Sequence, residues 1–182
     1  METKKNQGLL EVDFILNQIK VAQGQKIAEL GSGSSGYFTF PLARAVGGKG
    51  KVFALDVVKQ NLEILEKEKK QRNQVNIKTV WTDLEVYKAT DVETESIDRA
   101  LLINTLFQTN KKEGVLKEAY RLLKKDGYLL IVEWKNSDSP LGPPLEKRVD
   151  PDFLKATASK AGFKLEKEFN AGEYHYGILL VK

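Results

Sequence analysis

Apolar positions in this sequence follow two different periods that alternate along the chain. Short, nearly continuous apolar runs predict strands buried on both faces, and they lie at 27–30, 51–56, 75–80, 96–104 and 128–134. Segments with an apolar residue every three or four positions predict amphipathic helices, at 9–19, 37–46, 59–72, 111–123 and 151–161. Strands that alternate with helices predict an α/β fold with a parallel sheet.

Turn and loop residues complete this pattern. Residues 124–127, which contain two lysines and end in glycine, are expected to close the helix before the fifth strand. The last two strands, at 163–169 and 176–182, are joined by a short turn and must therefore be antiparallel. The proline-rich segment 135–149 is expected to form a loop over the substrate, or alternatively a plain surface connector.

The most informative stretch is 27–36, where an apolar run ends in an acid and a glycine-rich turn opens a helix. Glycine lets a ligand approach bare backbone, and the free N–H groups at the helix start favour an anionic group. Glu29 stands two residues before Gly31, where it would repel a nucleotide pyrophosphate. S-adenosylmethionine (SAM) fits better, because its amino-acid tail carries both an ammonium and a carboxylate.

This stretch resembles motif I of the class I SAM-dependent methyltransferases, (E/D)-x-G-x-G-x-x-G, at Glu29, Gly31, Gly33 and Gly36. The resemblance covers nearly the whole chain. It implies a seven-stranded, doubly wound, Rossmann-like sheet in the order 3-2-1-4-5-7-6, with an antiparallel last strand and helices on both faces. We expect one SAM-dependent methyltransferase domain over 1–182, with 1–8 flexible. Within the superfamily, the chain is similar to small bacterial quinone-biosynthesis and arsenite methyltransferases.

Position and resemblance together indicate a cofactor site. Asp56 ends the second strand at the edge where such sheets bind ligands, and it is expected to accept hydrogen bonds from the ribose, with capping of the next helix as the alternative. The resemblance places Asp83 and Leu84 on the adenine, while a plain turn acid is the alternative for Asp83. The predicted cofactor-binding residues are Glu29, Gly31, Ser32, Gly33, Tyr37, Asp56, Val57, Asp83, Leu84 and Asn104. The expected product is S-adenosylhomocysteine.

The acceptor side is expected at the ends of the fourth and fifth strands. The resemblance places Asn104 beside the transferred methyl group, and the antiparallel last strand begins near the same edge, just after His175. We predict both as catalytic residues, with His175 as a general base; contact with the 135–149 loop or exposure to solvent is its alternative. The helix over 9–19 is expected across the mouth of the site, or as a cap on the core. The predicted substrate residues are Phe107, Trp134, Tyr174 and Tyr176.

Composition narrows the chemistry. The 182 residues carry a net charge of +4, which is too weak to indicate nucleic acid as a partner. The chain has no cysteine and a single histidine, so we expect no metal and disfavour arsenite as the acceptor. The sequence shows neither an apolar run of membrane-spanning length nor a signal-peptide core, which predicts a cytoplasmic protein.

These features predict a SAM-dependent methyltransferase that acts on a small molecule or a lipid head group, as a monomer or homodimer. The sulfonium of SAM is already a good leaving group, so the protein needs chiefly to bind and align the reactants. Three alternatives stay open: a protein or RNA methyltransferase, an NAD(P)-dependent oxidoreductase, and a non-catalytic SAM-binding protein. The sequence does not decide whether oxygen, nitrogen or carbon is methylated.

Overall fold

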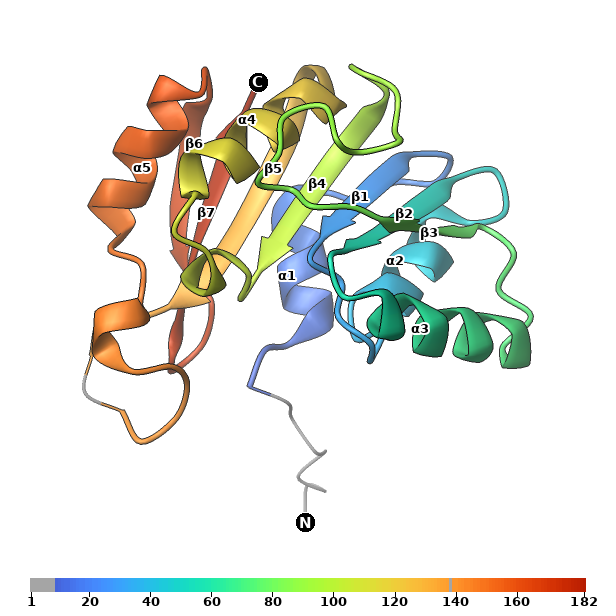
Figure 1. Cartoon of the computed structure of the whole chain (residues 1–182), viewed down its shortest axis with the longest axis horizontal. Coiled ribbons are helices and arrows are strands. Elements are labelled where there is room, and N and C mark those ends of the chain that lie inside the picture. Colours follow the sequence, from blue (N-terminus) through green and yellow to red (C-terminus); the bar gives the residue numbers. More distant parts are fainter. Residues whose placement is uncertain (1–8, 138) are drawn as a thin grey trace.

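The computed structural model describes residues 9–137 and 139–182, so the expected flexibility of 1–8 lies outside the described residues. Seven strands of this part form one sheet in the order β3-β2-β1-β4-β5-β7-β6 (Figure 1). They are β1 (Lys26–Leu30), β2 (Lys51–Asp56), β3 (Ile77–Trp81), β4 (Ile97–Ile103), β5 (Leu123–Trp134), β6 (Lys164–Asn170) and β7 (His175–Val181). Only β7 runs antiparallel to both of its neighbours. The predicted strand order and antiparallel end are therefore confirmed.

Helices cover both faces of the sheet, as predicted (Figure 1). The helices are α1 (Val12–Ile19), α2 (Thr39–Val46), α3 (Lys59–Gln71), α4 (Lys112–Leu122) and α5 (Pro151–Lys160), with short 3₁₀ turns η1 (Leu106–Gln108) and η2 (Leu145–Lys147). Successive strand residues face opposite sides, so Ile27 packs with the buried faces of α1 and α2, while Ala28 packs with those of α4 and α5. This two-sided burial explains the continuous apolar runs in the sequence.

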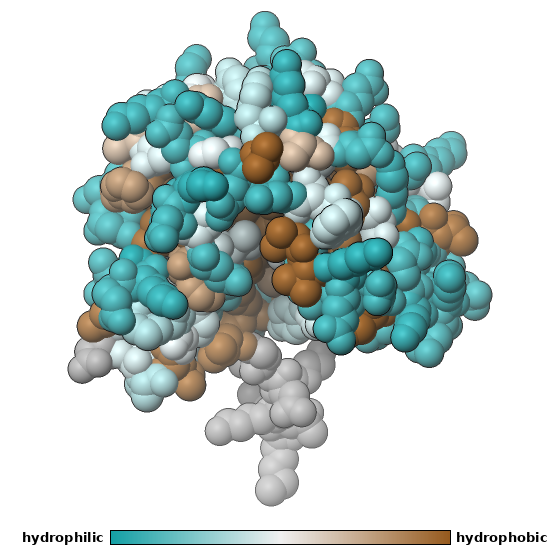
Figure 2. All heavy atoms as spheres, viewed as in Figure 1, coloured by the Kyte–Doolittle hydropathy of each residue, from teal (hydrophilic) through white to brown (hydrophobic). Residues whose placement is uncertain are grey.

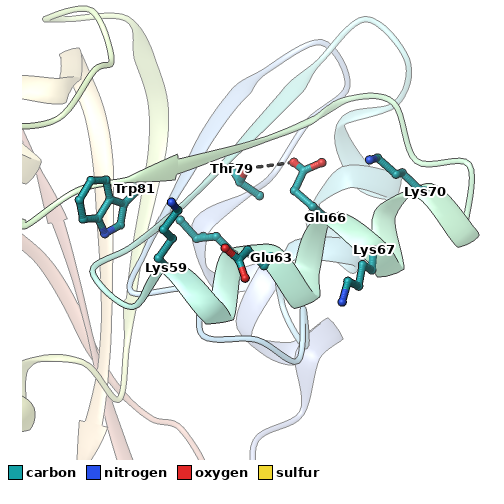
Figure 3. A pocket seen from close by; sticks show the side chains of 8 residues that line it. Lys59, Glu63, Glu66, Lys67, Lys70, Thr79 and Trp81 are labelled. Atoms are coloured by element: carbon teal, nitrogen blue, oxygen red, sulfur yellow. Dashed lines mark hydrogen bonds between the residues drawn. The ribbon is translucent and has the colours of Figure 1, made fainter.

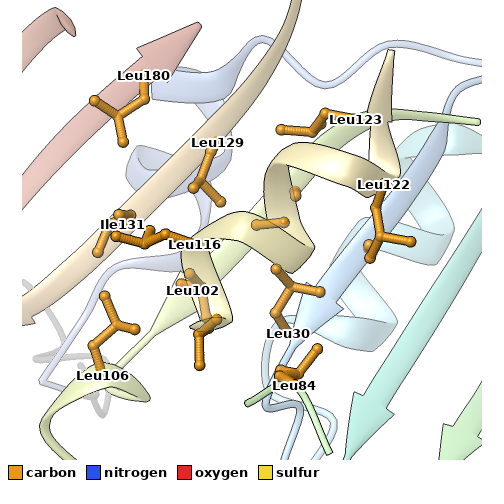
Figure 4. Close-up of a cluster of buried hydrophobic side chains, with 14 of the residues drawn as sticks. Leu30, Leu84, Leu102, Leu106, Leu116, Leu122, Leu123, Leu129, Ile131 and Leu180 are labelled. Atoms are coloured by element: carbon orange, nitrogen blue, oxygen red, sulfur yellow. The ribbon is translucent and has the colours of Figure 1, made fainter. Parts of the chain in front are cut away.

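The core beneath α4 also supports the end of the sheet where a site is expected. Leu102 of β4 and Leu116 of α4 are fully buried in it, and burial of one such side chain contributes about 1.5–3 kcal/mol. Leu106 of η1 and Leu84, which follows β3, belong to the same cluster (Figure 4). The loops that leave β3 and β4 are thus anchored in the core.

The structure corrects the predicted turn at 124–127. Helix α4 ends at Leu122, and β5 already begins at Leu123. Ile97 pairs with Leu123, but Arg99 pairs with Tyr128, so β5 carries extra residues in a bulge. Within the bulge Asp126, rather than the following glycine, takes the left-handed backbone conformation (φ 61°). Non-local pairing with β4 therefore overrides the local turn signal.

The face of the molecule drawn in Figure 2 is mostly hydrophilic. On the face drawn in Figure 2, apolar side chains form small separate groups among hydrophilic ones. Isolated exposed apolar residues need no special explanation. Among the helices of 9–137 and 139–182, none combines the length and the apolar character needed to cross a membrane.

Candidate functional site

The glycine loop, residues 31–36, is fastened to the end of β2. The amides of Gly31 and Ser32 both donate to the carbonyl of Leu55 at 2.9 Å, and the Gly33 amide donates to Asp56 Oδ2 at 2.8 Å. The first three amides of the loop are therefore used within the protein. What the loop offers a ligand is close access to its backbone.

Gly31 and Gly33 of this loop have different surroundings. Gly31 has φ 84°, and a Cβ there would lie 2.7 Å from the side chain of Thr105, so the protein's own packing requires glycine. Gly33 has φ 61°, but a Cβ there would meet nothing within 4 Å. The space beside Gly33 is therefore open.

A cavity of about 310 Å³ lies beside this loop, and we call it the glycine-loop pocket. Its volume falls in the range of small-molecule sites, about 300–1,000 Å³. Six predicted cofactor-binding residues line it, namely Gly31, Gly33, Asp56, Val57, Asp83 and Leu84. Val58, the neighbour of Val57, also lines the pocket. The lining residues that were not predicted as part of the site are Asn61, Thr82, Glu85, Thr105, Gln108, Thr109 and Val115. Asn61 and Val115 lie in the first turns of α3 and α4, and the others lie in loops or in η1. The apolar period in the two helices predicts a helix and does not indicate a ligand contact.

The Asp56 carboxylate is buried at the wall of the pocket. Besides the Gly33 amide, it accepts hydrogen bonds from the Val58 amide at 2.8 Å and from Asn61 Nδ2 at 3.3 Å. It thus bonds to the start of α3, as the capping alternative proposed, while it also lines the pocket. A carboxylate has about four acceptor positions, so capacity for a ligand hydroxyl remains. Asp83 likewise accepts the Glu85 amide at 2.9 Å as a turn acid and also lines the pocket.

Glu29 lies in β1, two residues before the glycine loop; it is almost fully buried and does not line the glycine-loop pocket. Burial raises its pKa to about 8; the Thr39 hydroxyl, which donates to it, opposes this effect, and the nearby charge of Asp56 adds to it. Near pH 7 the carboxyl is therefore mostly protonated, unless a cation approaches. A buried acid of this kind is suited to ionise when a positively charged group binds.

Tyr37 does not line the glycine-loop pocket. It is 45% exposed, and its hydroxyl donates to the carbonyl of Leu10 at 2.7 Å, which links the segment before α1 to the glycine loop. The buried face of α1 packs into the core, as its alternative proposed. Ser32 and Asn104 also lie outside the lining of this pocket.

The structure brings Asn104, Trp134 and His175 together at the ends of β4, β5 and β7. Asn104 Nδ2 and His175 Nε2 are 3.1 Å apart, and the His175 ring lies 4.2 Å from that of Trp134. His175 is fully buried, so the solvent-exposed alternative is wrong. Burial, aided by the charge of Lys135, lowers its pKa to about 4. The imidazole is therefore neutral at physiological pH.

In the described part of the chain, the Asn104–His175 pair leaves two buried polar atoms unsatisfied. Asn104 Oδ1 and His175 Nδ1 are buried, and neither finds a hydrogen-bond partner among the residues that the structure describes. Asn104 also has φ 52°, a left-handed conformation that is unusual outside glycine. Unsatisfied polar atoms and backbone strain tend to occur together at functional sites.

The other predicted substrate residues are not gathered around this pair. Phe107 lines a separate hollow of about 610 Å³ between η1 and α5. The Tyr176 hydroxyl donates to the carbonyl of Val149 at 2.8 Å, on the side of α5. Tyr174 lines a third hollow, beside Phe14 of α1. These residues therefore do not form one common pocket.

Arg148 organises the loop between β5 and α5, and it was not predicted from the sequence. Its buried guanidinium donates to the carbonyls of residues 135, 137, 139, 141 and 143 at 2.6–3.4 Å. Gly142 packs so closely on Trp134 that a Cβ there would lie 2.5 Å from the indole. The described part of this loop is thus wrapped around one cation and covers Trp134.

A hollow of about 470 Å³ between α3 and the edge strand β3 is a weaker candidate (Figure 3). Charged side chains such as Lys59 and Glu66 line it, together with Trp81, whose Nε1 donates to the carbonyl of Val57 at 3.0 Å. It contains none of the predicted site residues. In the described part of the chain, no group of three His, Cys, Asp or Glu side chains could hold a metal ion.

Comparison with known proteins found a matching family, curated relatives and solved structures of similar fold. The family described as "Methyltransferase domain" matches residues 28–131, more than half of the chain. The ubiquinone/menaquinone biosynthesis C-methyltransferase UbiE of Cronobacter sakazakii is 27% identical over 164 residues, which cover 90% of this chain and 61% of that protein. The demethylmenaquinone methyltransferase of a Geobacillus species is 28% identical over 65% of this chain and 49% of its own length. The chain thus spans about half to three-fifths of these relatives.

A solved structure shows the same fold. The SAM-dependent methyltransferase of Aquifex aeolicus superposes with a TM-score of 0.87 at 21% identity, over 95% of this chain and 90% of that one. At this identity the likeness is one of fold. It includes the antiparallel end of the sheet, which the resemblance to the SAM-dependent enzymes implied.

Proposed function

The chain belongs to the methyltransferase domain family, and on that premise we propose that it transfers a methyl group from SAM, the cofactor of this family and fold, to a small molecule or lipid head group. The observation that carries the proposal is the buried Asp56 carboxylate, which is bonded to the Gly33 amide at the wall of the glycine-loop pocket. When bound, SAM supplies a methyl group on a sulfonium that is activated for displacement.

The residues of the pocket fit this cofactor. The free acceptor capacity of Asp56 suits ribose hydroxyls, and the exposed side chain of Val57 offers an apolar wall for adenine. The open space at Gly33 allows close approach to the backbone. Just before the loop, the raised pKa of Glu29 is expected of a carboxyl that ionises only when a cation such as an ammonium arrives.

On the acceptor side, the Asn104–His175 pair supports an orienting role. Asn104 Oδ1, which has no hydrogen-bond partner among the described residues, can accept a hydrogen bond from the acceptor or the cofactor, while His175 Nε2 holds the Asn104 amide through its nitrogen. General-base catalysis by His175 stays a hypothesis, and a pKa near 4 makes it a weak base. Because one relative is named a C-methyltransferase, carbon acceptors are the first to test.

Calorimetric titration with SAM and with NAD tests the cofactor assignment directly. We expect SAM to bind and NAD not to bind; the reverse result would contradict the proposal. Incubation with isotope-labelled SAM and a cell extract, followed by mass spectrometry, then identifies the methylated product. Binding of SAM without any transfer would instead support the non-catalytic alternative.

A further inference from the structure

Glu133, next to the end of β5, is a fully buried carboxylate that the proposed function does not yet use. Its Oε1 accepts the Leu106 amide at 2.6 Å, whereas its Oε2 finds no hydrogen-bond partner among the described residues. An acid is rarely buried unless it is paired, because removing the charge from water is unfavourable. The contact with Leu106 therefore needs a reason.

The segment that Glu133 holds is the 104–108 turn, which follows β4 and contains η1. The turn begins with the left-handed backbone of Asn104 (φ 52°). Its centre is fixed from two sides, since the Leu106 side chain is buried in the core (Figure 4) while its amide is bound by Glu133. The Gln108 side chain closes the turn by donating to the Asn104 carbonyl at 2.8 Å.

This turn forms one side of the proposed cofactor site. The Thr105 hydroxyl donates to the carbonyl of Leu30 at 3.1 Å, and the same side chain fills the space against Gly31. Thr105 and Gln108 both line the glycine-loop pocket. A shift of the turn would therefore move the glycine loop and the pocket wall together.

We propose that Glu133 is a positioning residue for SAM binding: by accepting the Leu106 amide, it holds the 104–108 turn in its strained conformation against the glycine loop. The proposal rests on the proposed function, because it assumes that SAM occupies the pocket. Glu133 acts through the turn and does not line the pocket itself. Burial raises the pKa of Glu133 to about 7, although the Leu106 amide and other nearby backbone amides act to lower it, which is in keeping with a carboxyl retained for this contact.

Three variants test this role. Glu133→Leu removes the acceptor, whereas Glu133→Gln keeps an oxygen that can accept the Leu106 amide. Asn76→Leu is the control, since Asn76 is also buried and donates to the carbonyls of Ala43 and Gly47 at the opposite end of the sheet. SAM affinity is measured by calorimetry, and hydrogen exchange of the Leu106 amide by NMR.

In Glu133→Leu we expect roughly tenfold weaker SAM binding and at least about tenfold faster exchange of Leu106, which corresponds to the loss of one hydrogen bond to a charged acceptor. Glu133→Gln should restore most of both, and Asn76→Leu should lose thermal stability but bind SAM like the parent. Unchanged affinity or slow exchange in Glu133→Leu, no rescue by glutamine, or an equal loss of affinity in Asn76→Leu would overturn the proposal. If the parent itself binds no SAM, the proposed function fails, and exchange of Leu106 still decides whether Glu133 holds the turn.

Discussion

Binding of SAM should remove a proton from Glu29, which makes the affinity depend on pH in a defined direction. The side chain is almost fully buried, and its pKa is raised from 4.5 to about 8, chiefly by loss of hydration. Near pH 7 the free protein therefore holds this proton in most molecules. The ammonium of SAM favours the ionised carboxylate, so the proton must leave when the two groups meet.

The expected size follows from linkage. Between pH 6 and 7, where SAM carries its ammonium, each pH unit should change SAM affinity by about tenfold, with tighter binding at higher pH. The effect on the free protein has the opposite direction. Because the folded state holds this proton between about pH 4.5 and 8 and the unfolded chain does not, the contribution of Glu29 to stability is complete below pH 4.5 and decreases as pH rises through 8.

Calorimetry at pH 6 and 7, in buffers that differ in ionisation enthalpy, counts the protons released. Glu133 also has a raised pKa, of about 7, so the Glu29→Gln variant is needed to assign the proton. In that variant the linkage should disappear. A second control is 5′-methylthioadenosine, which lacks the amino-acid tail and should bind without proton release. Equal SAM affinity at both pH values, with no dependence on buffer, would refute the assignment of Glu29 to the ammonium.

Further substitutions test the remaining assignments. Asp56→Ala removes charged-acceptor hydrogen bonds worth about 1.5–3 kcal/mol each, so SAM affinity measured by calorimetry should fall at least about tenfold while circular dichroism stays native; unchanged affinity would contradict its role. Gly33→Val should abolish SAM binding, because a branched side chain would fill the open space and resist φ 61°; full SAM occupancy in a crystal of the variant would disprove this. His175→Ala should slow methyl transfer by about 100-fold if the imidazole is the general base. An unchanged rate across pH would show that His175 has only a structural role. Arg148→Ala should make the loop around 135–143 sensitive to limited proteolysis, because five carbonyls lose their common donor; a cleavage pattern like that of the parent would show that the loop does not depend on it.

The arrangement of strands and helices could be predicted because the sequence patterns that indicate it are local. Alternating periods predicted the strands and helices, and the glycine motif at Gly31, together with Asp56 at the end of the second strand, predicted the position of the pocket. The bulge at 124–127 was not predictable from its own residues, since it depends on pairing with β4. Arg148 gave no signal either, because its partners are backbone carbonyls that any sequence could supply.

Glu133 could have been recognised, and the prediction for Tyr176 could have been sharper. An acid inside the apolar run of β5 departs from the pattern of a fully buried strand, which is a reason to expect a specific partner. Neighbouring strand residues face opposite sides of a sheet. Since β7 begins at His175, that ring lies by Asn104, while Tyr176 lies on the side of α5 and bonds to Val149.

In the described part of the chain, the energetically unfavourable features, a partly buried left-handed residue and buried carboxyls with raised pKa values, concentrate towards the edge of the sheet where the parallel strands end. Five non-glycine residues with positive φ lie in exposed positions, whereas the sixth, Asn104, is partly buried. Glu118 is buried too, yet its pKa is lowered, because Arg121 and backbone amides satisfy it. Glu29 and Glu133 are buried as well, but for them the loss of hydration outweighs the hydrogen bonds that they accept, and their pKa values are raised. Features of this kind persist where polar groups are kept for a ligand. The edge around Asn104, rather than the charged hollow at Trp81, is therefore where the methyl acceptor should be sought.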